Sequence, residues 1–179
     1  AGEYGDYAIN IYTGCNHGCA YCYAAKMAKR WGKDFTNVEP RVGIVEATKR
    51  QIEREGITGK LIHLCFTCDP YPADIDTSVT REVIRAIKDS GNHVQILTKG
   101  GMESTRDFDL LNSSDWFGVT YTGGLNGVGC ENDYEPNAAP DGERFVALAD
   151  AYSAGIKTWL SCEPVLEDSG IFHAIRHND

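Results

Sequence analysis

Short apolar segments alternate along the chain with longer segments whose apolar residues recur at helical spacing. Residues Leu61–Phe66 are almost continuously apolar, which is typical of a strand covered on both faces of a parallel sheet. The same pattern predicts five strands in all, at Tyr7–Tyr12, Leu61–Phe66, His93–Thr98, Trp116–Tyr121 and Thr158–Cys162.

The segments between these strands carry the start and stop signals of helices. Thr80–Ser90 opens on a residue that can cap a helix, carries Val83, Ile84 and Ile87 on one face, and ends before Gly91. Further helices are predicted at Cys22–Trp31, Val45–Glu55, Asp141–Ser153 and Asp168–Arg176, with a long irregular connection or lid over 123–142. This alternation predicts an α/β fold with a parallel sheet and right-handed crossovers.

Length and composition fit a globular protein rather than a fibrous or disordered one. The 179 residues suit a single domain over 1–179, and no apolar run is long enough to span a membrane. The net charge of −9 argues against a protein that coats nucleic acid. Residues 22–60 nevertheless carry a net of +4. That segment leaves nucleic-acid phosphate or an acidic redox partner open, although the plainer interpretation is a solvated helix face.

The seven cysteines are an odd number, and three of them, Cys15, Cys19 and Cys22, lie within eight residues. This distribution favours a reduced, cytoplasmic chain with a metal or cluster site over a disulfide framework. Three thiolates on one short loop can hold a four-iron cluster and leave one iron without a protein ligand. A structural zinc site with His17 as fourth ligand is the alternative.

The segment Tyr12–Ala24, with aromatic Tyr21 before the last cysteine, resembles the radical S-adenosylmethionine (radical SAM) superfamily, in the branch related to spore photoproduct lyase. Residues 67–72 and 97–99 resemble that branch too. The resemblance implies an α/β fold that is a partial (βα)6 barrel with parallel strands, here truncated after the fifth βα unit. It also implies a [4Fe-4S] cluster on Cys15, Cys19 and Cys22, with S-adenosyl-L-methionine as the second cofactor.

The same resemblance implies an enzyme. Reductive cleavage of S-adenosylmethionine gives a 5′-deoxyadenosyl radical, which takes a hydrogen atom from a substrate that the sequence does not identify. A nucleic-acid lesion is one candidate substrate, the expected reductant is a flavodoxin or ferredoxin, and a monomer is expected. The rival functions are a structural zinc- or iron–sulfur-binding module that binds nucleic acid, and an electron-transfer protein that makes no radical.

Polar residues gather where the predicted strands end, the edge at which parallel α/β proteins bind ligands. Lys99 is predicted to pair with the cofactor carboxylate and is a candidate catalytic residue. Asp69 or Thr67 is expected to accept from the cofactor's amino group. The remaining candidate cofactor-binding residues are Tyr21, Thr120 and Glu163.

Four cysteines lie outside the loop. The resemblance makes Cys65 a candidate hydrogen-atom donor, and a small buried side chain is the plainer interpretation. Cys65 and Cys68 are expected to point to opposite faces of a strand, which disfavours them as joint ligands. Cys162 is expected to pack in the core or line the pocket, and Cys130 lies in the long connection. A second cluster on these four cysteines is left as an alternative.

Overall fold

The computed structural model describes residues 2, 4–123 and 134–166, and these form a five-stranded sheet. The strands follow the chain in the order β1-β2-β3-β4-β5, and every neighbouring pair is parallel. The five strands are β1 (Tyr7–Ile9), β2 (Leu61–Leu64), β3 (His93–Thr98), β4 (Trp116–Thr120) and β5 (Lys157–Ser161). The predicted α/β fold with a parallel sheet is therefore confirmed.

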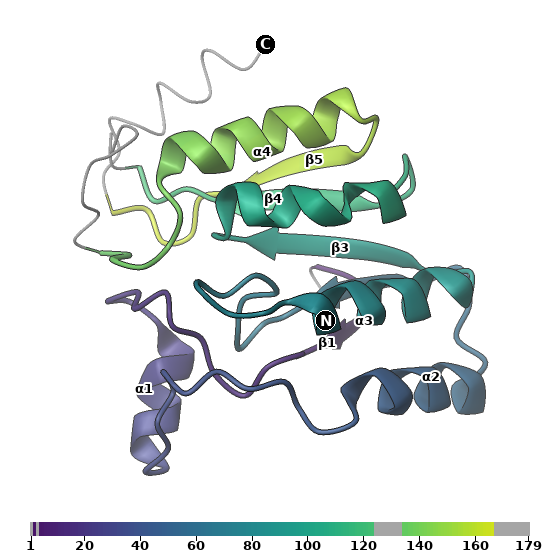
Figure 1. Ribbon diagram of the computed structural model, residues 1–179, viewed down its shortest axis with the longest axis horizontal. Coiled ribbons are helices and arrows are strands. Elements are labelled where there is room, and N and C mark those ends of the chain that lie inside the picture. The colour runs from purple at the N-terminus through teal and green to yellow at the C-terminus, as the bar shows by residue number, and fades with distance from the viewer. Residues whose placement is uncertain (1, 3, 124–133, 167–179) are drawn as a thin grey trace.

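The helices occupy two places relative to this sheet. One set covers a single face of it, and a shorter helix stands apart near the end of the sheet (Figure 1). The covering set is α2 (Ile44–Glu55), α3 (Ser78–Asp89), the 3₁₀ helix η1 (Gly101–Leu110) and α4 (Asp141–Ser153), and the separate helix is α1 (Tyr23–Arg30). The predicted bounds of β3 and α4 match those of the structure, and η1 lies in a segment where no helix was predicted.

The core lies between the sheet and these covering helices. Ile62 and Leu64 of β2 are fully buried and share one apolar cluster with Ile84 and Ile87 of α3. Strand β1 is shorter than predicted because the chain leaves β2 after Ile9. Ile11 and Tyr12 are apolar and fully buried, but they lie outside the sheet.

The other face of the sheet carries aromatic and polar side chains. Tyr4, His63 and Phe66 pack together, with the rings of His63 and Phe66 4.5 Å apart at their centroids. The Trp159 ring lies over Gly118, where an added Cβ would come within 2.2 Å of the indole nitrogen. Gly118 is therefore required for Trp159 to lie against β4.

His63 makes the stability of this face depend on pH. Burial lowers the pKa of its imidazole from 6.5 to about 4, so the unfolded chain binds more protons than the folded chain between those values. The stabilisation is fully present above pH 6.5 and is lost as the pH falls toward 4. We expect the free energy of unfolding to drop by about 2.5 kcal/mol from this group between neutral pH and about pH 4.5.

Urea unfolding at the two pH values measures this drop. His63→Phe keeps a ring beside Phe66 and removes the titrating nitrogen, so most of the drop should disappear. An unchanged drop in His63→Phe would show that other groups carry the pH dependence.

Three remaining expectations concern the ends of the described segments. The predicted helix Asp168–Arg176 lies outside the described residues, as does Cys130. Part of the connection predicted over 123–142 is described, and its last two residues already belong to α4. Within the described ranges, no helix is both long and apolar enough to cross a membrane.

Candidate active site at the carboxyl edge of the sheet

The three clustered cysteines lie on the loop that leads from β1 into α1. The Cys15 amide donates to the Phe35 carbonyl at 2.9 Å, and the Cys22 sulfur caps α1 by accepting from the Ala25 amide at 3.4 Å. A Cβ on Gly14 would lie 2.2 Å from the Phe35 carbonyl oxygen, so only glycine allows this close approach. The loop thus presents three free, half-buried thiols at the amino end of a helix.

The chemistry of these thiols suits a cluster. Burial raises the pKa of the Cys15 thiol to about 12 and also raises the pKa of Cys19, so a positive centre is needed to hold them as thiolates. Among the residues that the structure describes, no three His, Cys, Asp or Glu side chains converge on a point that could hold one ion. A cubane cluster needs no such convergence, because each iron takes its own thiolate.

His17, the fourth ligand of the alternative zinc site, lies buried beside Asp69. The ring is 2% exposed, and its Nδ1 lies 3.5 Å from Oδ2 of Asp69. Burial lowers the pKa of His17, while the neighbouring Asp69 opposes that shift. His17 therefore joins the cysteine loop to the edge residue Asp69.

Residues 134–140 lie against the cysteine loop. The Ala20 amide donates to the Tyr134 carbonyl at 2.8 Å, and the amide and side chain of Asn137 donate to the carbonyls of His17 and Asn16 at 3.1 and 2.8 Å. This contact could not be predicted from the sequence, because the segment has no periodic pattern. Its only signal is a short polar and proline-containing run before α4.

Glu135, in this segment, is a fully buried carboxylate that gathers three other charged or polar groups. The Tyr21 hydroxyl donates to its Oε1, and Lys99 Nζ lies 4.0 Å from the same oxygen. Arg144 Nη2 lies 2.7 Å from Oε2. Burial, followed by the charge of Glu135, raises the pKa of Tyr21. The structure therefore brings the predicted residues Tyr21 and Lys99 together, around a partner that was not predicted.

Asp69 accepts hydrogen bonds at the carboxyl edge of the sheet, beside Tyr21 and Lys99. Its Oδ1 accepts from the Tyr71 amide at 2.8 Å and from the Thr98 hydroxyl at 2.6 Å, and its Oδ2 accepts from the Lys99 amide at 2.9 Å. The side chain is buried, so these groups and His17 surround the carboxylate. Asp69 thus fixes the backbone that carries Lys99, and its predicted contact with a cofactor stays a prediction.

The other predicted cofactor residues are spread along the same edge. The Thr67 amide donates to Asn10 Oδ1 at 2.8 Å, and Thr120 is buried at the end of β4. Glu163 is exposed beyond β5 and accepts from the Tyr4 hydroxyl at 3.2 Å. Thr67, Thr120 and Glu163 thus lie at the same edge as Tyr21 and Lys99. Their contacts with a cofactor stay predictions.

The expectation that Cys65 and Cys68 point to opposite faces assumes that both lie on a strand. Strand β2 ends at Leu64, and Cys65 adopts a left-handed backbone conformation with φ 69°, so the alternation of a strand does not apply to them. Burial raises the pKa of Cys65 well above its ordinary value. Cys162 is half-buried beyond β5.

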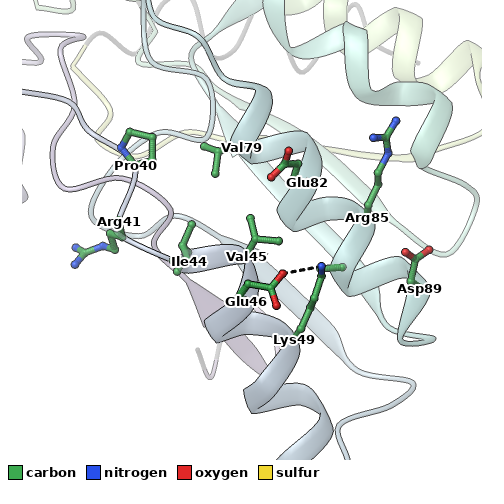
Figure 2. A pocket seen from close by; sticks show the side chains of 12 residues that line it. Pro40, Arg41, Ile44, Val45, Glu46, Lys49, Val79, Glu82, Arg85 and Asp89 are labelled. Atoms are coloured by element: carbon green, nitrogen blue, oxygen red, sulfur yellow. Dashed lines mark hydrogen bonds and ion pairs between the residues drawn. The ribbon is translucent and has the colours of Figure 1, made fainter.

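A separate groove of about 600 Å³ lies between α2 and α3 (Figure 2). Its lining mixes acidic and basic side chains, including the Lys49–Glu46 ion pair at 2.9 Å. None of the cysteines lines it. The groove is therefore distinct from the carboxyl edge that carries the predicted chemistry.

Comparison with known proteins places the chain in a family. The family described as a protein of unknown function (DUF5131) matches residues 2–174, and the chain belongs to this family. An uncharacterized protein of Methanocaldococcus jannaschii is 32% identical over 173 residues, covering 90% of this chain and 61% of the relative. An uncharacterized protein of Mycobacterium tuberculosis is 26% identical over 176 residues, covering 92% and 52%. The chain thus spans about half to three-fifths of these relatives.

Solved structures of spore photoproduct lyase share the fold. A mutant of that lyase with bound AdoMet and dinucleoside spore photoproduct superposes with a TM-score of 0.74 and 19% identity, over 98% of this chain and 52% of the lyase. Spore photoproduct lyase complexed with dinucleoside spore photoproduct gives the same values. The parallel sheet with alternating helices therefore has the fold of about half of that lyase.

Proposed function

We propose that this protein is a radical SAM enzyme in which Cys15, Cys19 and Cys22 hold a [4Fe-4S] cluster. When bound, the cluster supplies the electron that cleaves S-adenosylmethionine to methionine and a 5′-deoxyadenosyl radical. The observation that carries this proposal is the placement of three free, half-buried thiols beside Lys99 and Tyr21, at the carboxyl edge of a radical SAM fold.

The residues around the loop position and shield the cofactors. Lys99 offers a cation to the cofactor carboxylate, and its ammonium lies 5.7 Å from the centre of the Tyr21 ring. Glu135 holds both side chains, and Asp69 fixes the Lys99 backbone. Residues 134–140 cover part of the loop and exclude water from it. Thr67, Thr120 and Glu163 are proposed to reach the amino, ribose or methionine parts.

A zinc module is less well supported. In the described part of the chain, no three His, Cys, Asp or Glu side chains converge on one point that could hold a zinc ion. An electron-transfer iron–sulfur protein would share the cysteine loop but would have no use for a cation and an aromatic ring placed to bind S-adenosylmethionine. The arrangement of Lys99 and Tyr21 therefore favours the radical enzyme.

The substrate and the reductant are proposed by chemical class only. The lyase with the same fold was solved with a dinucleoside photoproduct, and residues 22–60 here carry a net of +4. We therefore propose a nucleic-acid substrate, together with a flavodoxin or ferredoxin as the electron donor. Cys65 remains a proposed hydrogen-atom donor.

Anaerobic purification tests the central proposal. We expect a brown protein with about four irons and four sulfides per chain. Dithionite and S-adenosylmethionine should then yield 5′-deoxyadenosine, measured by chromatography and mass spectrometry. A colourless protein with one zinc would overturn the cluster assignment. A brown protein that leaves S-adenosylmethionine intact would favour simple electron transfer.

A further inference from the structure

Helix α1, which follows the cysteine loop, exposes large apolar and positively charged side chains. We propose that α1 is a binding surface for single-stranded nucleic acid, with phosphates on its cations and a base stacked on Trp31. This inference rests on the proposed nucleic-acid substrate, and it names the surface that holds the strand beside the loop.

The sequence of α1 separates its small side chains from its large ones. The three alanines of the helix are buried or half-buried, so they form its inner side. Tyr23, Met27 and Trp31 follow one another at intervals of four residues, which places them on one face. They are 55%, 51% and 74% exposed. Three such side chains on one short helix form a patch, which is typical of a binding surface.

Positive charge surrounds this patch. Residues 22–33 carry four cations and no acid, whereas residues 34–60 carry five cations and five acids. The whole excess of +4 in residues 22–60 therefore lies on α1 and the residues just after it. All four side chains are exposed, and the ion pairs among the described residues include none of them. These cations are Lys26, Lys29, Arg30 and Lys33.

The rest of the chain directs an anionic partner to this helix. Because the whole chain carries −9 and residues 22–33 carry +4, the remainder carries −13. A polyanion is repelled by that remainder and attracted to α1, so its binding is local. Such a surface holds a short length of strand instead of coating it.

The exposed ring of Trp31 favours a single strand over an acidic protein. Surfaces that bind single strands combine cations along the backbone with aromatic rings on which bases stack. Lys26 and Arg30 lie one helical turn apart beside the row that ends at Trp31, so charge and ring stand together. An acidic protein would use the same cations but would have no base to stack. A duplex would keep its bases paired and away from the indole.

The position of α1 places this surface next to the proposed chemistry. The helix begins at Cys22, whose sulfur accepts from the Ala25 amide at 3.4 Å. The Tyr23 hydroxyl donates to the Phe66 carbonyl at 2.8 Å, which ties the first turn to the chain just after β2. Figure 1 shows α1 apart from the helices that cover the sheet. A strand bound along α1 therefore leads to the cysteine loop.

Fluorescence anisotropy of a labelled oligonucleotide tests the inference on the full chain. The probe is fluorescein-labelled oligothymidine of about 12 nucleotides, within the site sizes of single-strand-binding folds. The protein is purified anaerobically and measured without S-adenosylmethionine or a reductant. We expect saturable binding whose affinity falls roughly 50-fold between about 50 and 200 mM salt, because four cations release the counterions of four phosphates.

Two kinds of variant separate stacking from charge. Trp31→Ala should weaken binding roughly 10-fold and leave the salt dependence unchanged, because it removes a ring and no charge. The matched control Tyr152→Ala removes a ring of α4 that is 75% exposed, and it should bind like the wild type.

Lys29→Gln should lower the slope of log affinity against log salt by about 0.7, the value for one phosphate contact on a single strand. The control Arg54→Gln removes an exposed cation that pairs with Glu55 at 2.9 Å, and it should keep the slope. All four substituted side chains are exposed, so the variants should fold, which circular dichroism checks.

Several results would overturn the inference. They are the absence of saturable binding at the lower salt concentration, wild-type affinity in Trp31→Ala, and equally tight binding of the matching duplex. Equal competition by polyglutamate would assign α1 to an acidic protein, and a dimer that Trp31→Ala dissociates in gel filtration would assign it to a second copy.

The binding result stands apart from the proposed radical chemistry. A chain that binds the oligonucleotide through α1 but yields no 5′-deoxyadenosine with dithionite would contradict the radical enzyme and keep the surface. A chain that cleaves S-adenosylmethionine but does not bind the oligonucleotide would contradict only the role of α1.

Discussion

Replacing Cys19 with Ala is expected to abolish both the brown colour and S-adenosylmethionine cleavage. Cys19 is the central thiol of the loop and interacts with the Tyr21 side chain. Without it the loop keeps two thiols, too few to hold a four-iron cluster that already leaves one iron open. We expect the iron content to fall close to zero. 5′-Deoxyadenosine formation should fall by roughly 100-fold or more, beyond what loss of an outer partner of a metal site usually causes.

Cys162→Ala is the matched control, because that cysteine is also half-buried and unpaired by a disulfide but lies beyond β5. It should keep the iron and the cleavage activity. Circular dichroism of both variants separates loss of the cluster from loss of the fold. A Cys19→Ala protein that keeps about four irons would show that the ligand assignment is wrong.

The regular parts of the fold could be predicted because local pattern and burial agree there. Leu61–Leu64 is almost continuously apolar and lies inside the sheet, between β1 and β3. The helix Asp141–Ser153 was predicted from its apolar spacing together with its start and stop signals. The start of the chain was harder, because Ile11 and Tyr12 are apolar and fully buried but lie outside the sheet.

The site could be predicted only where its chemistry is local. The spacing of the three cysteines predicts the loop. The position of Lys99 at the end of a parallel strand predicts that it lies at the ligand-binding edge. Glu135 could not be found in this way, because it meets Tyr21 across 114 positions of sequence. The orientation of Cys65 and Cys68 could not be predicted from strand alternation, because β2 ends at Leu64 and Cys65 is left-handed.

Arg144 was missed for a related reason: a charged residue on an amphipathic helix normally faces water, yet this one is 1% exposed. Its Nε donates to the Ala139 carbonyl at 2.7 Å and its Nη1 donates to the Thr120 carbonyl at 3.0 Å. The guanidinium also lies 2.7 Å from Glu135 and 3.4 Å from Asp141. It therefore links α4, β4 and the segment over the cysteine loop.

We expect Arg144→Leu to lower the free energy of unfolding by about 3–5 kcal/mol, measured by urea denaturation of the apoprotein. Truncating one member of a buried ion pair leaves its partners charged and desolvated, which destabilises far more than the intact pair stabilises. Here Asp141 would lose its cation, Glu135 would lose its shorter ion pair and keep only Lys99 at 4.0 Å, and two carbonyls would lose a donor.

The exposed Lys49–Glu46 pair provides the contrast within the same chain. Its N–O distance is 2.9 Å, but both side chains are more than half exposed. Lys49→Ala should therefore change the free energy of unfolding far less than Arg144→Leu does. If Arg144→Leu were as mild as Lys49→Ala, the carboxylates would have to be protonated or hydrated in the folded protein. The buried cluster would then not hold residues 134–140 against the cysteine loop, and Glu135 would not position Lys99 and Tyr21.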